Sequence, residues 1–357
     1  MDITRRQLLM GMQAFVGATL VGPRIAQAKS LRRLKFGVGL KSISATVING
    51  VIGEALGYNR EEGFTLVAEP LGTNSNVQVA TARGDVDIGI GVPSFGLPLL
   101  AKHEWAPLIN YFEYTYPFKW DVAVLPSSPI RNYAELRGKR IGVSNFGSTE
   151  YPVTKEVLKR NGIDPDRDVQ WVAVGAGVTA GIALQKGTID ALAYFDTGFG
   201  QVEANGIALR FLPRPANIPM IGGQFLMAKK ETIAQERQLA VGLARSIAKS
   251  SYFIIANPEA GAKVFLEMYP QAAPRGSSQA EAVKAIVTTI SRRIKLYAPP
   301  YKGAKMGSIN VQEFETEARI DGLKIANFHD FYTNALIDEI NNFDVAAIQQ
   351  QAMDYKV

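Results

Sequence analysis

The chain of 357 residues contains no cysteine, and it contains only two histidines, His103 and His329. Without cysteine there can be no disulfide, no cysteine-based zinc site and no thiol nucleophile. A cysteine-linked lipid anchor is not expected for the same reason. Two isolated histidines argue against a histidine-rich metal site and against a pair of catalytic histidines. These absences exclude enzymes that depend on thiols, and we expect neither a cofactor nor a bound metal ion.

The sequence also lacks runs of lysine and arginine. Its 39 basic and 33 acidic residues are scattered and give a formal net charge of +6. A charge of this size can favour anionic ligands, but it is not the clustered basic surface with which proteins bind nucleic acids. A content of 47% hydrophobic and 20% charged residues is ordinary for a globular protein. At about 150 residues per domain, the length predicts two domains.

The first 28 residues have the layout of a secretory signal peptide. Arg5 and Arg6 precede a mildly apolar run from Leu8 to Gly22, and Ala26-Gln27-Ala28 is a small-x-small cleavage signature. The paired arginines resemble a twin-arginine leader; an ordinary secretory leader and a disordered basic N-terminus are the alternatives. The apolar run is shorter than the about 20 residues of a membrane span, and no later segment is expected to span. We therefore expect an exported, soluble, periplasmic protein without a lipid anchor.

Two stretches of the chain have nearly the same pattern. Residues 83–90, Arg-Gly-Asp-Val-Asp-Ile-Gly-Ile, are echoed by residues 186–193, Lys-Gly-Thr-Ile-Asp-Ala-Leu-Ala. The glycine after a helical stretch indicates a helix stop, because glycine adopts the left-handed conformation without a Cβ penalty. The apolar run that follows predicts a short buried strand. The repeat predicts two similar α/β lobes with a ligand cleft between them, and we expect Asp87 and Asp190 to brace strand ends.

The same order of elements surrounds each copy of this motif. Strands are predicted at 34–40, 64–69 and 86–90, and again at 141–143, at 169–174 and directly after Asp190. Because these strands alternate with helices, they predict mostly parallel sheets. The rest of the chain is predicted to be helical without a new strand, with helices at 239–254, after Asn257, at 277–297, at 311–321 and at 331–341.

The chain resembles the periplasmic substrate-binding proteins of ABC importers, of the nitrate/sulfonate/taurine and thiamine-precursor type. The strongest mark is the stretch from Tyr133 to Val143, Tyr-Ala-Glu-Leu-Arg-Gly-Lys-Arg-Ile-Gly-Val, with Gly147-Ser148 after it. Both glycine-x-valine/isoleucine-aspartate strands and the helix start at Asn257-Pro258-Glu259 match as well. Each piece is short, and it is their order and spacing along the whole chain that make the resemblance specific.

The resemblance implies a two-lobe α/β fold that closes on one small polar or anionic organic solute. Lobe one is expected at residues 31–124 plus 222–357 and lobe two at 125–221, with crossings near Leu125-Pro126 and Ile221-Gly222-Gly223. The implied partner is an ABC permease in the inner membrane, and a monomer is expected. A periplasmic sensor that reports to a receptor and a cysteine-independent enzyme on the same fold remain as alternatives.

Candidate ligand-binding residues come from loops that follow the strands, because ligands bind at the carboxyl ends of strands in such sheets. Hydroxyls and backbone N–H groups at a helix N-terminus can hold an anionic or polar group, although simple helix capping would use the same residues. Asp196 could instead pair with a basic residue, and Tyr114 could instead be core. The candidates are Ser42, Ser44, Asn74, Ser94, Tyr114, Ser144, Gly147, Ser148, Thr149 and Asp196.

Overall fold

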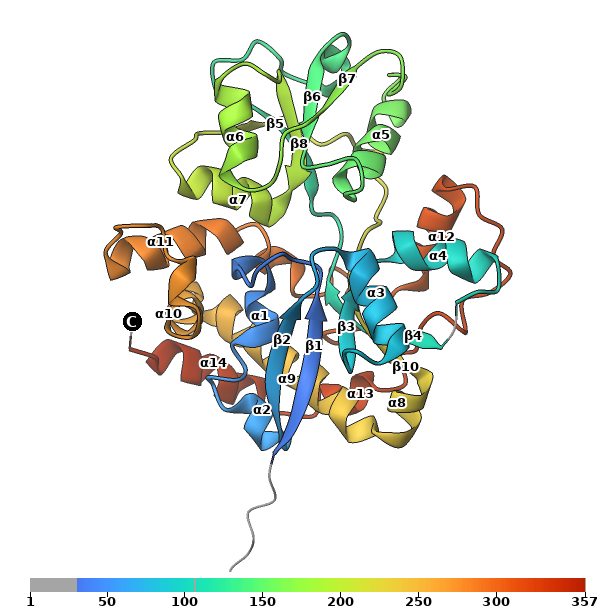
Figure 1. Cartoon of the computed structure of the whole chain (residues 1–357), viewed down its shortest axis with the longest axis vertical. Helices are drawn as coiled ribbons and strands as arrows, with labels where there is room; N and C mark the ends of the chain where they lie inside the picture. The colour runs from blue at the N-terminus through green and yellow to red at the C-terminus, as the bar shows by residue number, and fades with distance from the viewer. Residues whose placement is uncertain (1–30, 106, 357) are drawn as a thin grey trace, which may run out of the picture. The chain divides into compact units, whose positions relative to one another are not determined.

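The computed structural model describes residues 31–105 and 107–356, and its strands form two five-stranded mixed sheets flanked by helices (Figure 1). Residues from Arg32 onward belong to one compact unit. The expected signal peptide, residues 1–28, lies outside the described residues. The two sheets confirm the predicted α/β fold class.

The first sheet, sheet A, has the strand order β2-β1-β3-β10-β4. Strands β2, β1 and β3 are parallel, whereas β10 is antiparallel to both β3 and β4. The parallel strands are those of the predicted strand–helix repeat. The bounds are Arg32–Val38 for β1, Phe64–Pro70 for β2, Ile88–Gly91 for β3, Leu108–Thr115 for β4 and Gln224–Lys229 for β10.

The second sheet, sheet B, has the order β7-β6-β8-β5-β9 and repeats this plan. Strands β7, β6 and β8 are parallel, and β5 is antiparallel to β8 and β9. The bounds are Trp120–Val124 for β5, Arg140–Val143 for β6, Gln170–Ala173 for β7, Ala191–Phe195 for β8 and Arg210–Phe211 for β9.

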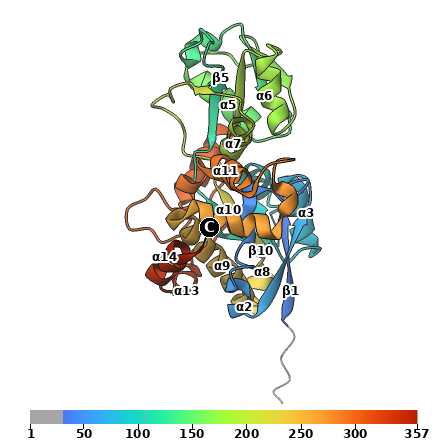
Figure 2. The ribbon, with the colours of Figure 1, turned by 90° about the vertical axis from the view of Figure 1, so that its left-hand side faces the viewer.

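The helices connect these strands and cover their faces. In the sheet A half they are α1 (Ile48–Val51), α2 (Tyr58–Glu61), α3 (Asn74–Arg83), α4 (Pro93–Ala101), α8 (Lys230–Gln235), α9 (Arg237–Ala256), α10 (Pro258–Met268), α11 (Gln279–Ile290), α12 (Val311–Ile320), α13 (Ile337–Ile340) and α14 (Val345–Asp354). In the sheet B half they are α5 (Glu150–Arg160), α6 (Val178–Gln185) and α7 (Asp196–Ala204). Helices α10, α13 and α14 gather around α9 (Figure 2).

The inner strands β5, β8 and β10 are buried on both faces, and because side chains along a strand alternate, each of these strands contributes to two cores. In β10, Leu226 and Ala228 join the core shared with α9, whereas Phe225 and Met227 join the core shared with α3 and α12. In sheet B, the β5 residues Trp120, Val122 and Val124 pack toward α5, and Ala123 packs toward α6. Two-sided burial explains why these strands are short continuous apolar runs.

Like the short strand β9, strand β10 is a correction to the prediction that no strand follows the second motif. It is the apolar run Phe-Leu-Met-Ala, which is buried on both faces and therefore lacks the alternation that marks a half-buried strand. Strand β5 corrects the first crossing. Because β5 pairs in sheet B, the chain leaves sheet A between Thr115 and Trp120, rather than near Leu125-Pro126.

The predicted helix at 331–341 is also wrong over most of its length, since only Ile337–Ile340 is helical. The backbone of the preceding residues is used by sheet A instead. Asn110 N–H donates to the Phe331 carbonyl at 3.0 Å, and Thr333 N–H donates to the Asn110 carbonyl at 2.8 Å. This isolated bridge to β4, between Asn110 and Tyr332, takes the backbone groups that a helix would need.

Helix α9 is long and apolar enough, by length and composition, to cross a membrane. However, 72% of its apolar window is buried inside the protein. A core helix of a globular protein passes the same test, and α9 packs against α1, α10, α13 and α14. Its hydrophobicity is therefore explained by its place in the core.

The two motif aspartates have the same structural role, as predicted. Asp87 accepts the Lys35 N–H at 2.8 Å and pairs with Arg32 at 3.0 Å. Asp190 accepts the Arg140 N–H at 2.8 Å and binds the guanidinium of the same residue at 2.8 Å. Each aspartate thus ties the loop before its own strand to the neighbouring parallel strand. The motif glycines Gly84 and Gly187 have φ values of 87° and 66°, which confirms the helix stops.

We predict that Asp87→Ala and Asp190→Ala each lower the free energy of unfolding by about 1–2 kcal/mol, because a strand N–H and an arginine lose a charged acceptor. Urea unfolding followed by circular dichroism measures the change. The control is Asp338→Ala, which removes an exposed pair with Lys305 and should cost under about 0.5 kcal/mol. Equal losses in all three variants would contradict the bracing role.

Candidate ligand-binding site

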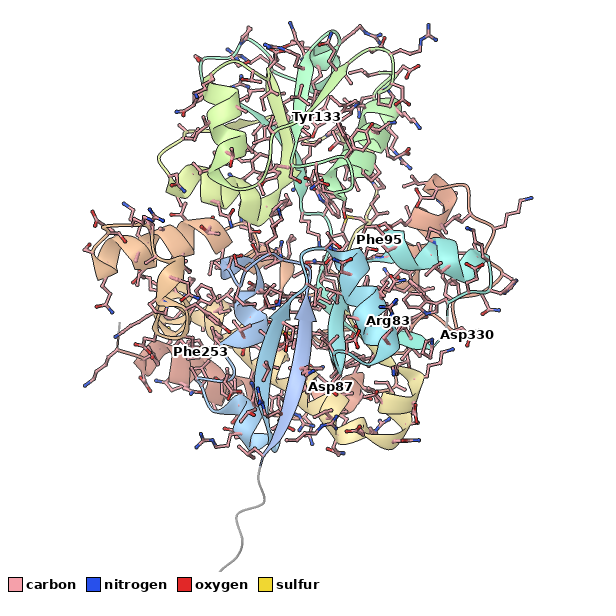
Figure 3. The ribbon with its side chains drawn as sticks, viewed as in Figure 1. Arg83, Asp87, Phe95, Tyr133, Phe253 and Asp330 are labelled. Carbon is pink, nitrogen blue, oxygen red and sulfur yellow. The ribbon has the colours of Figure 1, made fainter. Side chains whose placement is uncertain are left out.

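A pocket of about 300 Å³ lies where α4, α5 and α12 meet. It receives residues from the start of α4, from the loop before α5, from the segment before β10 and from the end of α12. Figure 3 labels Phe95, which lies at the first turn of α4. The lining is Ser94, Phe95, Phe146, Gly147, Ser148, Thr149, Pro152, Val153, Glu156, Ile221, Glu317, Ile320 and Asp321. The structure therefore brings together four of the predicted residues: Ser94, Gly147, Ser148 and Thr149.

The loop before α5 is ordered by its own hydrogen bonds. Asn145 accepts the Gly147 N–H at 2.9 Å through its side chain, and its carbonyl accepts the Ser148 hydroxyl at 2.7 Å. Ser144 lies 3.0 Å from the Ser148 hydroxyl and donates its N–H to Glu150 at 3.1 Å. Thr149 is the N-cap residue of α5, yet its side chain makes no capping hydrogen bond. Helix capping therefore does not explain the Thr149 side chain, and Thr149 lines the pocket.

The opposite wall of the pocket is acidic. Glu317 is 5% exposed, and its Oε2 has no hydrogen-bond partner among the described residues. Burial raises the pKa of Glu317 to about 8, with the Asp321 charge acting in the same direction and the Gly222 N–H acting against it. Burial and then the Glu156 charge also raise the pKa of Asp321. Glu156 itself accepts a hydrogen bond from Arg160 at 2.7 Å.

A second set of buried charges lies beside this wall, where the chain crosses from β4 to β5. Burial raises the pKa of Glu113 and brings that of Glu313 to about 7. The Tyr301 hydroxyl donates to Glu313 at 2.6 Å. Lys119 donates to Thr115 at 3.1 Å, and burial, together with the Arg293 charge, lowers the pKa of Lys119 to about 7. Burial thus disfavours the charged form of each of these three side chains at the crossing.

Asp196 lies outside the pocket, at the start of α7, and forms a buried ion pair with Arg293. The two side chains are 5% and 2% exposed, and the guanidinium donates to both carboxylate oxygens at 2.5 and 2.6 Å. A hydroxyl contact of 3.2 Å joins Thr46 to Thr197 nearby. The backbones of α7 and α11 approach closely here, since a Cβ on Gly200 would collide with the Thr289 backbone.

The remaining candidates are distributed over the sheet A half. Tyr114 is fully buried in the core beside Gly50, and burial raises the pKa of its hydroxyl. Asn74 lies over Gly39, which has no side chain to obstruct it. Ser42 and Ser44 are in the loop after β1, and Ser44 makes no capping hydrogen bond through its side chain. None of these four residues lines the pocket described above.

The acidic wall was missed by the sequence analysis, although a signal for it exists. Glu313, Glu317 and Asp321 recur at a spacing of four, which places them on one side of the predicted helix at 311–321. This face also carries the buried Phe314 and Ala318. Carboxylates on the apolar side of an amphipathic helix are expensive to bury and therefore point to a specific role.

We predict that stability falls as pH rises from about 5 to about 7. In this pH range Glu313 and Glu317 keep their protons in the folded state. In the unfolded state they lose them, because the ordinary pKa of a glutamate carboxyl is 4.5. Each group therefore stabilises the fold below pH 4.5, and this contribution is lost as pH rises through its folded pKa, by at most about 1.4 kcal/mol per pH unit. Glu317→Gln should flatten this slope in thermal or urea unfolding. The exposed neighbour variant Glu315→Gln should keep the wild-type slope; a Glu317→Gln slope equal to wild type would contradict the assignment.

We predict that Asp196→Ala lowers the free energy of unfolding by about 3–5 kcal/mol, because it leaves Arg293 buried without its anion. The double variant Asp196→Leu with Arg293→Met removes both charges and should recover most of that loss in the same unfolding assay. If Asp196→Ala proved as stable as wild type, the ion pair would not be structural.

Comparison with known proteins gives a family and a fold. The family model described as NMT1/THI5 like matches residues 45–261. No curated protein matches the chain. A structure of a protein from Bordetella bronchiseptica RB50 is similar with a TM-score of 0.62 and 20% identity, covering 87% of this chain and 96% of that one.

Two sulfonate-binding proteins are similar at 17% identity. The periplasmic aliphatic sulphonate binding protein of Escherichia coli has a TM-score of 0.61, covering 91% of this chain and 100% of that one. The alkanesulfonate-binding protein of Xanthomonas axonopodis pv. citri, bound to MOPS, has a TM-score of 0.58, covering 88% and 99%. At these identities the likeness establishes the fold, and the ligand must be argued from this chain's own residues.

Proposed function

Because the chain belongs to the NMT1/THI5-like family, we propose that it is an extracytoplasmic solute-binding component of an ABC importer. The observation that carries this proposal is the pocket of about 300 Å³, which joins the loop before α5 in the sheet B half to α4 and α12 in the sheet A half. A pocket of that size is suited to a small organic molecule. The sulfonate-binding proteins of the same fold support the choice of a binding role.

In this proposal, lobe one carries sheet A with the C-terminal helices, and lobe two carries sheet B. The chain crosses between them at residues 116–119 and again at residues 212–223. A solute held by both walls of the pocket stabilises the closed arrangement, because it makes its full set of contacts only there. The closed form then delivers the solute to a membrane permease.

The chemistry of the pocket supports binding rather than turnover. Its lining contains no histidine, and the chain has no cysteine to act as a nucleophile. Ser148 is hydrogen-bonded within its own loop, so no general base is positioned on it. Ser148, Thr149 and the N-terminus of α5 instead offer hydroxyls and N–H groups to a polar group of the solute. Export to the periplasm is part of the proposal and rests on residues 1–28.

We predict that a true solute at about 100 times its dissociation constant raises stability by roughly 2.7 kcal/mol, seen as a higher melting temperature. The panel should contain sulfonates, nitrate, thiamine-type pyrimidines, aromatic carboxylates and organic amines. Ser148→Ala combined with Thr149→Ala should weaken any hit about tenfold or more, which corresponds to about 1.4 kcal/mol.

The matched control is Ser291→Ala, at an exposed serine after α11 that is not among the residues lining the pocket. It should leave the affinity of every hit unchanged. Chemical conversion of a bound hit by the protein would contradict a binding-only role, and a hit unaffected by the Ser148 and Thr149 changes would remove the α5 loop from the site.

A further inference from the structure

The ionisable side chains that line the pocket are all acidic. Glu156, Glu317 and Asp321 contribute carboxylates, and the thirteen lining residues include no lysine, arginine or histidine. The protein as a whole has a formal net charge of +6, so this wall opposes the overall charge. A cationic solute would favour the ionised form of these carboxyl groups, whereas an anionic solute would disfavour it.

Glu317 provides the second observation, which is independent of the count of carboxylates. Its side chain is more than nine-tenths buried, it lines the pocket, and its Oε2 has no partner among the residues that the structure describes. Burying a carboxylate without a partner is costly, and a cation that enters the pocket removes that cost. The side chain is therefore preset to receive a hydrogen-bond donor with positive charge.

The protein's own nearby cations do not pair with Glu317 or Asp321 among the described residues, although Arg160 pairs with the lining residue Glu156. Lys119 donates to Thr115 beside the Glu113 and Glu313 pair, and Arg160 donates to Glu156. A metal ion is not the expected occupant, since among residues 31–105 and 107–356 no group of three Asp, Glu or His side chains is placed to hold one.

The rest of the lining is apolar and partly aromatic. It consists of Phe95, Phe146, Pro152, Val153, Ile221 and Ile320. Phe146 is 54% exposed and makes a T-shaped contact with Tyr151, with 5.3 Å between the ring centroids, so part of its surface is available to a ligand. Aromatic faces attract both flat apolar bodies and cations.

We propose that the solute carries a positively charged nitrogen, an amine or an amidine on an apolar or aromatic body, and that Glu317 and Asp321 hold that nitrogen. The inference rests on the proposed solute-binding function and names its substrate class. The apolar body lies among the phenylalanine and isoleucine side chains, and Ser148 and Thr149 face any polar group at the other end.

The test uses three flat probes of similar shape: benzamidine, which is a cation, benzamide, which is neutral, and benzoate, which is an anion. Saturation-transfer NMR and titration calorimetry measure their binding to the wild-type protein at pH 8. We expect benzamidine to bind at least tenfold more tightly than either of the other two. Glu317→Gln should weaken benzamidine at least tenfold, Asp321→Asn should weaken it to a lesser degree, and Glu315→Gln on the exposed side of α12 should not change it.

Two controls keep the outcomes distinct. Without probe at pH 8, the Glu317→Gln variant should have a higher melting temperature than the wild-type protein. This result would show that the variant folds. It would also show that the native carboxyl group lowers the stability of the protein. Tighter binding of benzoate, or of a sulfonate from the solute panel, with dependence on Ser148 and Thr149, would overturn the cationic class and leave the solute-binding proposal standing. If Glu317→Gln left the affinity for benzamidine unchanged, the proposed role of Glu317 in binding a cationic solute would also be overturned. Absence of binding by the probes and by the entire panel would overturn both.

Discussion

The burial of charge at the crossings between the two sheets is the constraint on which the rest of the structure depends. Where the chain passes from β4 to β5, Glu113, Glu313 and Lys119 are enclosed, and at the start of α7 the Asp196–Arg293 pair is enclosed. A buried charge is tolerated only with a partner or with an altered protonation state. These groups therefore restrict how the sheet B half can pack against the C-terminal helices. Only an arrangement that pairs or neutralises each buried charge is stable.

The two sets of charges are treated differently by the fold. Asp196 and Arg293 satisfy each other through two hydrogen bonds, so this junction is complete without a solute. Glu317 is left with an oxygen that nothing in the described structure satisfies, at the edge of the pocket. Proteins commonly accept such local costs where a ligand will remove them. The contrast separates an aspartate that is paired within the protein from a glutamate that we propose to bind the solute, although both are buried to a similar degree.

Sequence patterns were sufficient for the parallel strands, for the glycine stops at Gly84 and Gly187, and for the capping of α11 by Ser278, where a capping box is present. They were insufficient for β10 and β5, because strands buried on both faces show no alternation. They also failed for residues 331–336, because the backbone of Phe331 and Thr333 is hydrogen-bonded to Asn110, which lies over two hundred residues earlier in the chain. Part of the candidate site, the loop from Gly147 to Thr149 with Ser94, could be predicted because loops after strands collect at one edge of a sheet.

By itself, the sequence determined the α/β class, the doubled motif and the absence of thiol chemistry, since all of these depend on residue types and on contacts between near neighbours. Only the tertiary structure decided what each acidic side chain does. Asp196 and Arg293 are 97 residues apart, and Glu317 lines the pocket together with Glu156 and with Ile221 from the second crossing. No local pattern encodes such pairs, because the free energy of a buried charge is set by whatever the fold brings beside it.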